Sequence, residues 1–481
     1  MPFEIIEMSI KINIFYSLVL TTANYIFPLL VYPYVSRVLG VEGIGICNYI
    51  DSIINYFVLF SMLGISIIGI REIASVKENR NKLDVKFTSL IIHTGLPTVL
   101  SSMAFLACFI LVPQLSCYRE FMYIGLAKIL GMVFTIDWFY KGIEDFKYIT
   151  TCTIIVKVFY VISVFVFIKS SDDYFTYFLL TSLMVVVNSV INLIYCRKYV
   201  SFSFNYEDFK SLIKPNLING FYLFLNSMYS SLNVAILGFV SDAIQVGYYT
   251  TANKIFGIIL SVYTAFTGVM LPRMSALANE SNDNQFQVLI DKSLNVLISF
   301  TLPVAIICTI LAPDIINVIS GVGYEGAYIP ARICMPLIFI VGYEQILVVQ
   351  ILTPLREDKM KFINSIIGAL VGIILNLLLV RHFFAIGATI VWFCSEFSVL
   401  VMAQYFVKKR IGLGFPFKKI MKEILLYLPL AISAIALTRV NLGSFTKVGL
   451  AVIVSSIYFV LINIYVKKND IILSLIKIKK K

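Results

Sequence analysis

Long apolar runs alternate with short polar breaks along the chain. A helix that crosses a hydrocarbon core of ~30 Å needs about 20 mostly apolar residues, and 14 runs of this kind can be delimited. They cover residues 12–34, 44–68, 87–112, 118–139, 149–168, 174–196, 216–239, 246–271, 293–312, 329–352, 361–380, 385–407, 422–438 and 446–466. The pattern predicts an all-α polytopic membrane protein with about 14 transmembrane helices.

The composition excludes a water-soluble enzyme. Apolar residues make up 59% of the 481 residues and charged residues 14%, whereas soluble domains have about 45–50% and about 25%. The eight cysteines are scattered singly and the two histidines are far apart, so we expect no disulfide framework, metal site or cofactor. The first apolar run is long enough to span, and we expect a retained helix rather than a cleaved signal peptide.

The distribution of Lys and Arg predicts the orientation. With the runs numbered in order, the even-numbered junctions and the two ends carry 29 of these residues, and the odd-numbered junctions carry six. Since cytoplasmic loops are enriched in Lys and Arg, both termini are expected in the cytoplasm. The formal net charge of +12 is then explained without nucleic acid, and the basic tail is expected to lie against anionic headgroups of membrane lipids.

An internal repeat is visible at an offset of 202 residues. It superposes GICNYIDSI (45–53) on GYYTTANKI (247–255) and Arg71 on Arg273. The offset equals six spans, an even number, so the two halves are expected to share one orientation in the membrane. Parallel repeats of this kind build two-lobed transporters.

The repeat predicts the domain organisation. We expect two pseudo-symmetric six-helix lobes, 1–199 and 216–410, joined by an interfacial linker, 200–215. Residues 411–481 would add a C-terminal helix pair and the basic cytoplasmic tail.

Several segments resemble the polysaccharide-transport branch of the multidrug/oligosaccharidyl-lipid/polysaccharide exporter superfamily, which includes O-antigen and capsule repeat-unit flippases. They are ANYIFPLLVYPYVSRVLGVEGIG (23–45), NYFVLFSMLGISIIGIREIAS (55–75), DWFYKGIEDFKYIT (137–150), GYYTTANKI (247–255) and LPRMSALAN (271–279). The resemblance implies a bacterial cytoplasmic (inner) membrane protein that moves an undecaprenyl-pyrophosphate-linked oligosaccharide outward by alternating access. It also implies coupling to a proton or sodium gradient and an association with polysaccharide polymerase machinery.

Charged residues inside the spans are costly and mark candidate functional sites. Lys128 is ten residues into its span and Lys157 and Lys254 are each eight residues in, which places all three at about 12–15 Å depth. Together they could hold a pyrophosphate, with Arg332 and Arg37 receiving it at the outer mouth. The alternative is that each lysine snorkels or pairs with a carboxylate, and that Arg37, in an outer loop, pairs with Glu42.

Three carboxylates and two prolines complete the candidate set. Asp51, Glu396 and Glu344 lie within spans and could couple a proton or sodium ion to transport, or could serve as structural partners of the lysines. Pro28 and Pro33 remove backbone donors from the first span and are expected to bend it, as a gate or as a static kink.

Three other functions remain open at this point. A cation-coupled multidrug exporter of the same superfamily would favour an anionic or aromatic pore. A peptidoglycan-precursor flippase would share the mechanism but fits the segment 137–150 less well. A membrane-embedded glycosyltransferase or polymerase is disfavoured because the longest expected extracytoplasmic loop, 313–328, is too short for an external catalytic domain.

Overall fold

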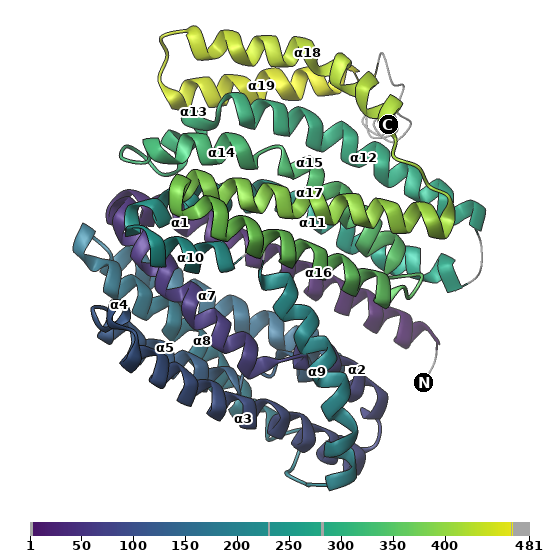
Figure 1. Ribbon diagram of the computed structural model, residues 1–481. Coiled ribbons are helices and arrows are strands. Elements are labelled where there is room, and N and C mark those ends of the chain that lie inside the picture. The colour runs from purple at the N-terminus through teal and green to yellow at the C-terminus, as the bar shows by residue number, and fades with distance from the viewer. Residues whose placement is uncertain (1–2, 229–230, 280–282, 463, 465–481) are drawn as a thin grey trace. The chain divides into compact units, whose positions relative to one another are not determined.

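A computed structural model describes residues 3–228, 231–279, 283–462 and 464. Within these ranges the protein is helical, without strands (Figure 1). The elements are α1 (Phe3–Met62), α2 (Ile65–Val76), α3 (Arg80–Leu111), α4 (Pro113–Ser116), α5 (Arg119–Met132), α6 (Asp137–Gly142), α7 (Phe146–Phe167), η1 (Ser171–Asp173), α8 (Tyr174–Cys196), α9 (Tyr206–Met228), α10 (Leu232–Val240), α11 (Ala243–Asn279), α12 (Asp283–Ile310), α13 (Ala312–Ile319), η2 (Glu325–Ala327), α14 (Tyr328–Cys334), α15 (Leu337–Gln345), η3 (Ile346–Leu352), α16 (Asp358–Leu375), η4 (Asn376–Val380), α17 (Arg381–Ile411), α18 (Phe417–Arg439) and α19 (Ser444–Leu461). The all-α prediction is confirmed.

Eleven helices of the described chain are long and apolar enough to cross a membrane, or 12 if α9 and α10, bent by 50°, form one span. Two of the 11 are 62 and 54 residues long, or about 93 and 81 Å at ~1.5 Å per residue. The longer one contains two residues with a positive φ, Gly40 (φ 69°, ψ 178°) and Leu63 (φ 41°), and the shorter one contains Phe384 (φ 45°, ψ −123°). A total of 14 spans stays a prediction.

Several helices extend beyond the predicted spans at their polar ends. Helix α3 begins at Arg80 rather than 87, and α9 begins at Tyr206, inside the predicted linker. The Asn79 side chain caps α3 by accepting a hydrogen bond from the backbone N–H of Lys82 (3.1 Å). Hydropathy marks only the part of a helix that lies in hydrocarbon, whereas Lys, Arg and Glu are good helix formers and continue it into water.

The chain forms two compact units. Unit 1 comprises Met1–Thr250 and Phe362–Ser398, and unit 2 comprises Thr251–Lys361 and Val399–Lys481. This division follows spatial contacts rather than the sequence repeat, and it falls within α11, α16 and α17. The predicted lobes and linker stay predictions.

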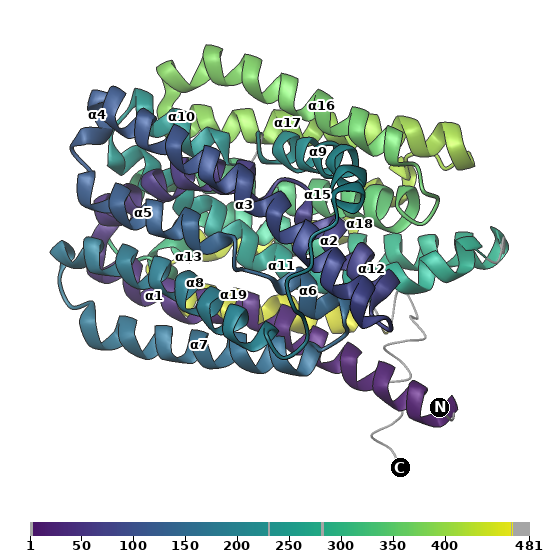
Figure 2. The ribbon, with the colours of Figure 1, turned by 90° about the horizontal axis from the view of Figure 1, so that it is seen from below.

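In unit 1, the helices α3, α5, α7 and α8 pack around α1 (Figures 1 and 2). Gly125 of α5 lies against α1 so closely that a Cβ there would come within 2.4 Å of the Ile54 side chain. Ile54 and Ile129 belong to one buried apolar cluster. This close approach places the polar residues one turn away on each helix, Asp51 and Lys128, next to each other.

Unit 1 also contains a direct contact between the two copies of the repeat. A Cβ at Gly45 would lie 1.7 Å from the carbonyl oxygen of Ala243, and a Cβ at Gly247 would lie 2.2 Å from that of Val41. Asn48 Nδ2 donates to Thr250 Oγ1 over 3.4 Å. Both Gly45/Gly247 and Asn48/Thr250 are separated by the repeat offset of 202, so equivalent residues meet where α1 and α11 cross.

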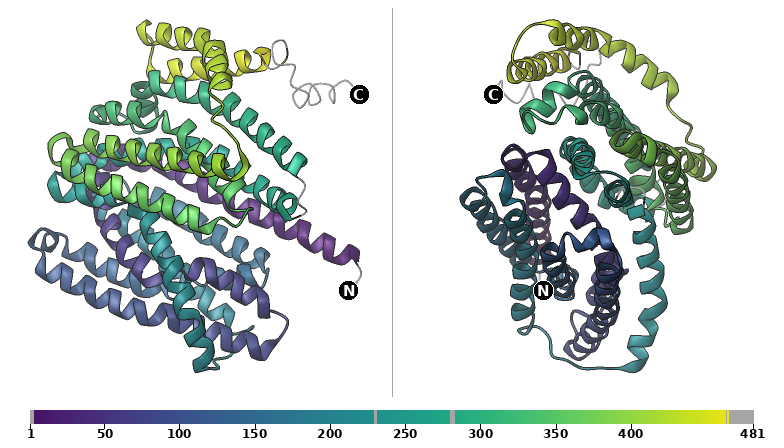
Figure 3. Two further views of the ribbon diagram at one scale, coloured as in Figure 1. Left: turned by 45° about the vertical axis from the view of Figure 1, so that its right-hand side comes forward. Right: turned by 60° about the vertical axis from the view of Figure 1, so that its left-hand side comes forward.

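Unit 2 is built on α12, which packs against α15 and α18. The C-terminal helices α18 and α19 lie side by side, and α19 contacts α13 (Figure 3). Tyr427 of α18 donates from its hydroxyl to the carbonyl oxygen of Ser299 of α12 (3.2 Å), and Tyr458 of α19 donates to that of Leu426 (2.7 Å). These bonds attach the C-terminal helix pair to the rest of unit 2.

Candidate functional site

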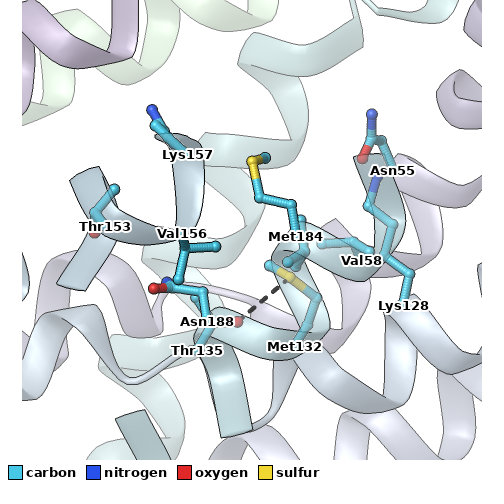
Figure 4. A pocket seen from close by; sticks show the side chains of 11 residues that line it. Asn55, Val58, Lys128, Met132, Thr135, Thr153, Val156, Lys157, Met184 and Asn188 are labelled. Atoms are coloured by element: carbon cyan, nitrogen blue, oxygen red, sulfur yellow. Dashed lines mark hydrogen bonds between the residues drawn. The ribbon is translucent and has the colours of Figure 1, made fainter. Parts of the chain in front are cut away.

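A cavity of about 350 Å³ lies inside unit 1 among α1, α5, α7 and α8 (Figure 4). We call it the lysine cavity because two lysines, Lys128 and Lys157, line it. Its lining residues are Asn55, Val58, Lys128, Met132, Thr135, Thr153, Val156, Lys157, Met184, Val185 and Asn188. Ligand pockets in proteins have volumes of about 300–1,000 Å³, so the lysine cavity can hold a headgroup but not a whole oligosaccharide.

Lys128 forms an ion pair at one side of the cavity. Its Nζ lies 2.5 Å from Oδ1 of Asp51, and the other oxygen, Oδ2, accepts a hydrogen bond from Asn55 Nδ2 (3.0 Å). The Lys128 side chain is 12% exposed and that of Asp51 39%. Lys128 and Asp51, both predicted site residues, are therefore an ion pair. For Lys128 the structure shows the alternative arrangement, in which the lysine pairs with a carboxylate.

Lys157 lies on the opposite side of the cavity from Lys128 and Asn55 (Figure 4). Its Nζ donates to Oδ1 of Asn24 on α1 (2.5 Å) and lies 5.8 Å from the centroid of the Phe27 ring. A cation over an aromatic face is attracted by the ring quadrupole. Lys157 thus carries its charge beside an amide and a ring, and attaches α7 to the segment of α1 that contains Pro28.

A buried hydrogen-bond network surrounds Asp137, next to the cavity residues Thr135 and Asn188. Asn192 Nδ2 donates to Asp137 Oδ1 (3.1 Å), and the Tyr140 hydroxyl donates to the backbone oxygen of Asn192 (2.6 Å). Thr135 Oγ1 lies 2.6 Å from Ser189 Oγ. Because buried polar groups are costly unless hydrogen-bonded, these contacts hold α6 and the turn between α5 and α6 in place against α8.

The other candidates in unit 1 lie on α1 and α17. Glu396 is 7% exposed and accepts a hydrogen bond from Nε1 of Trp392 (2.9 Å). Arg37 was expected in a loop, but it is an exposed residue within α1, three residues before the break at Gly40. Its helical position follows from the absence of a breaker between Pro33 and Gly40.

Unit 2 holds the remaining candidates. Lys254 on α11 and Arg332 on α14 are exposed, and Glu344 on α15 is half-buried. The structure thus brings two of the three predicted lysines to one cavity, and the contribution of Lys254 stays a prediction. Pro28 and Pro33 both lie inside α1, whose departure from helical dihedrals occurs at Gly40 instead. Their gating role is likewise untested.

Neutral amides are the site residues that sequence reasoning missed. Asn55 and Asn188 line the lysine cavity. A second amide pair lies elsewhere in unit 1, where Asn376 Nδ2 donates to Oδ1 of the fully buried Asn233 (2.7 Å). An asparagine inside an apolar run is the available signal, since it carries hydrogen-bonding groups that must find partners in the membrane.

Comparison with known proteins now adds to this geometry. The sequence profile of the family described as "Polysaccharide biosynthesis protein" matches residues 10–278, more than half of the chain. The chain belongs to this family. The match includes every residue that lines the lysine cavity.

Individual relatives and solved structures are also similar to this chain. The chain is 25% identical over 414 residues to the "Putative O-antigen transporter" of Escherichia coli (strain K12), covering 84% of this chain and 98% of that protein. It is 23% identical over 403 residues to the protein of the same name in Shigella dysenteriae, covering 82% and 99%. Among solved structures, "Lipid II flippase MurJ, inward closed conformation" matches with a TM-score of 0.75 at 14% identity, over 95% of this chain and 99% of that one. An inward-facing "multidrug resistance MATE family transporter of the MOP superfamily" matches with a TM-score of 0.61 at 12% identity, over 80% and 94%. The chain shares its overall fold with these two solved structures.

Proposed function

We propose that this family member is a flippase for a lipid-linked oligosaccharide, the undecaprenyl-pyrophosphate-linked repeat unit of a surface polysaccharide. The observation that carries the proposal is the lysine cavity. Moving a pyrophosphate through hydrocarbon is prohibitive unless the protein supplies cations and polar groups along the way. Two lysines and two amides on a largely apolar wall supply these, in a chain similar to proteins named as transporters and flippases of glycans.

The dimensions of the cavity suggest which part of the substrate would lie inside it. The pyrophosphate would occupy the lysine cavity, since ammonium groups form short charge-assisted hydrogen bonds with phosphate oxygens. The glycan and the polyprenyl tail would lie outside it, the tail among lipid chains. Alternating access in the bacterial inner membrane, with both termini cytoplasmic and polysaccharide polymerase machinery as the partner on the outer side, would complete the cycle.

The other candidate residues take proposed roles around this step. Lys254 would contribute a third ammonium group, and Arg332 and Arg37 would receive the headgroup at the outer mouth. Glu396 and Glu344, with Asp51, would couple transport to a proton or sodium gradient. Pro28 and Pro33 would let α1 bend to admit the tail.

Reconstitution of the purified protein tests the proposal. We expect it to move a fluorescent polyprenyl-pyrophosphate oligosaccharide between leaflets of a liposome, measured by quenching with dithionite, which does not cross the bilayer. Lys128→Ala with Lys254→Ala should abolish measurable transport, because the two lost charge-assisted hydrogen bonds contribute about 1.5–3 kcal/mol each, which together exceed a 100-fold change in rate. Membrane insertion should be unchanged, and replacing either lysine by glutamate should reduce transport more than replacing it by alanine.

Lys169→Ala is the matched control, since it removes an exposed lysine from the loop after α7. No transport by the wild-type protein under an imposed ion gradient would contradict the flippase proposal. Transport of lipophilic cations instead would indicate a multidrug exporter, and formation of a new glycosidic product would indicate an enzyme.

A further inference from the structure

The ammonium group of Lys128 already has an anionic partner within the protein, the Asp51 carboxylate. Its Nζ contacts Oδ1 of Asp51 at 2.5 Å, although both Lys128 and Asn55, which holds the other carboxylate oxygen, face the lysine cavity. The ammonium group has three donor hydrogens, but the Asp51 carboxylate already neutralises its charge, and a phosphate brought to the same nitrogen would be repelled by that carboxylate. Asp51 and the phosphate therefore compete for one binding position.

We propose that Asp51 is an internal competitor of the substrate: its carboxylate holds Lys128 in the empty transporter, yields to the pyrophosphate on loading and expels it on release. The inference rests on the proposed function and assigns Asp51 a role in the transport cycle beyond structural pairing. It involves exchange of noncovalent partners only.

The surroundings of the pair are suited to an exchange. Asp51 is 39% exposed, so its carboxylate is not enclosed by other protein groups and has room to move away from Lys128. Asn55 is on the same helix, one turn further along α1, and its hydrogen bond to Oδ2 over 3.0 Å gives the displaced carboxylate a second contact. Lys157, on the other side of the cavity, donates to an amide and forms no ion pair with a carboxylate among the described residues, so a pyrophosphate entering the cavity has a cation available before it displaces Asp51.

The exchange also explains why binding would not trap the substrate. A transporter must bind its substrate and then release it, and a site of two uncompensated lysines would hold a pyrophosphate too tightly. If Asp51 holds Lys128 about nine-tenths of the time, the apparent dissociation constant is about tenfold higher than that of the unblocked site. Asp51 is thus a positioning residue that lowers affinity and speeds release.

The test compares binding with transport. The probe is geranylgeranyl pyrophosphate, titrated against the purified full-length chain in detergent by isothermal calorimetry, with geranylgeraniol and inorganic pyrophosphate as reference compounds. Asp51→Asn should bind the probe about tenfold more tightly than the wild type. The same variant should transport the fluorescent oligosaccharide lipid in liposomes about tenfold more slowly at saturating substrate, with a lower KM.

Two further variants separate competition from a structural role. In a Lys128→Ala background, Asp51→Asn should no longer change the affinity for the probe, since the competed donor is gone. Glu144→Gln is the matched control, because it neutralises the carboxylate of an ion pair outside the cavity, with Lys77 (2.8 Å). It should leave affinity and transport unchanged. Asp51→Ser, a smaller neutral side chain, replaces Asp51→Asn if that variant does not fold.

The outcomes distinguish the two proposals. If the wild type binds and transports but neither neutral variant at position 51 tightens binding, the competitor inference is wrong and the flippase proposal stands. If neither the wild type nor any variant binds the probe, both are wrong. Tight binding of inorganic pyrophosphate alone, unaffected by Asp51→Asn, would also overturn the inference, since the competed site would then not be the headgroup site.

Discussion

Gly45→Ala is expected to separate α1 from α11 in unit 1 and to abolish transport. The new Cβ would lie 1.7 Å from the backbone oxygen of Ala243 and 3.0 Å from the nitrogen of Gly247. A backbone atom cannot rotate away, so the crossing helices must move apart. Overpacking of a close contact costs typically ~1–3 kcal/mol and occasionally more, and we expect the upper end here. Separation would also stretch the bond between Asn48 and Thr250.

The same helix supplies the control. Gly257 lies on α11 with nothing within 4 Å of the position that a Cβ would take, so Gly257→Ala should be neutral or slightly stabilising, because alanine is the better helix former. Thermal unfolding in detergent and the dithionite assay would be measured for both variants. Wild-type stability and transport in Gly45→Ala would show that the helices do not cross as closely as the structure places them.

This crossing illustrates what the repeat could and could not predict. The offset of 202 pairs Gly45 with Gly247, and small residues at corresponding positions are typical of closely packed membrane helices. The offset does not say that equivalent residues touch, because a repeat unit can lie at any distance from the symmetry axis. The contact between α1 and α11 therefore follows from the three-dimensional structure and not from the repeat.

The helices themselves were predictable because the bilayer imposes a length and a composition on each span. The prediction was least accurate at polar helix ends, such as Arg80 and Tyr206, where hydrocarbon stops but the helix continues. The prediction of a loop at Arg37 is wrong for a related reason: Arg37 follows the end of an apolar run, but a charged residue does not end a helix.

The sequence predicted two of the residues that line the lysine cavity but not their hydrogen-bonding partners. Depth along a span follows from residue counting and predicts similar levels for Lys128 and Lys157, and both residues line one cavity. Their partners, Asp51 and Asn24, are 77 and 133 residues away in sequence. Pairing them requires the order of helices and the rotation of each about its axis, which a single hydropathy profile does not contain.

Lys128→Met is expected to have the largest effect on transport of any single replacement in the cavity. It keeps most of the side-chain volume, removes the ammonium group and leaves Asp51 without its ion-pair partner. Breaking a buried pair costs ~3–5 kcal/mol, and the 39% exposure of Asp51 should reduce the loss of unfolding free energy to about 2 kcal/mol. Loss of the phosphate donor should slow transport about 100-fold.

The double variant Lys128→Met with Asp51→Asn separates stability from binding. Removing both charges eliminates the uncompensated carboxylate, so the melting temperature should return to within a few degrees of the wild type, because replacing both members of a pair is often nearly neutral. Transport should stay about 100-fold slow, since no ammonium group remains on that side of the cavity. A double variant that transports at the wild-type rate would mean that Lys128 serves Asp51 alone, and that the headgroup is held elsewhere. The transport rate of the double variant, at restored stability, is therefore the measurement that distinguishes the two roles of Lys128. Lys157→Met should be measured beside it, because this variant removes the ammonium group on the opposite side of the cavity and leaves the ion pair of Lys128 with Asp51 intact.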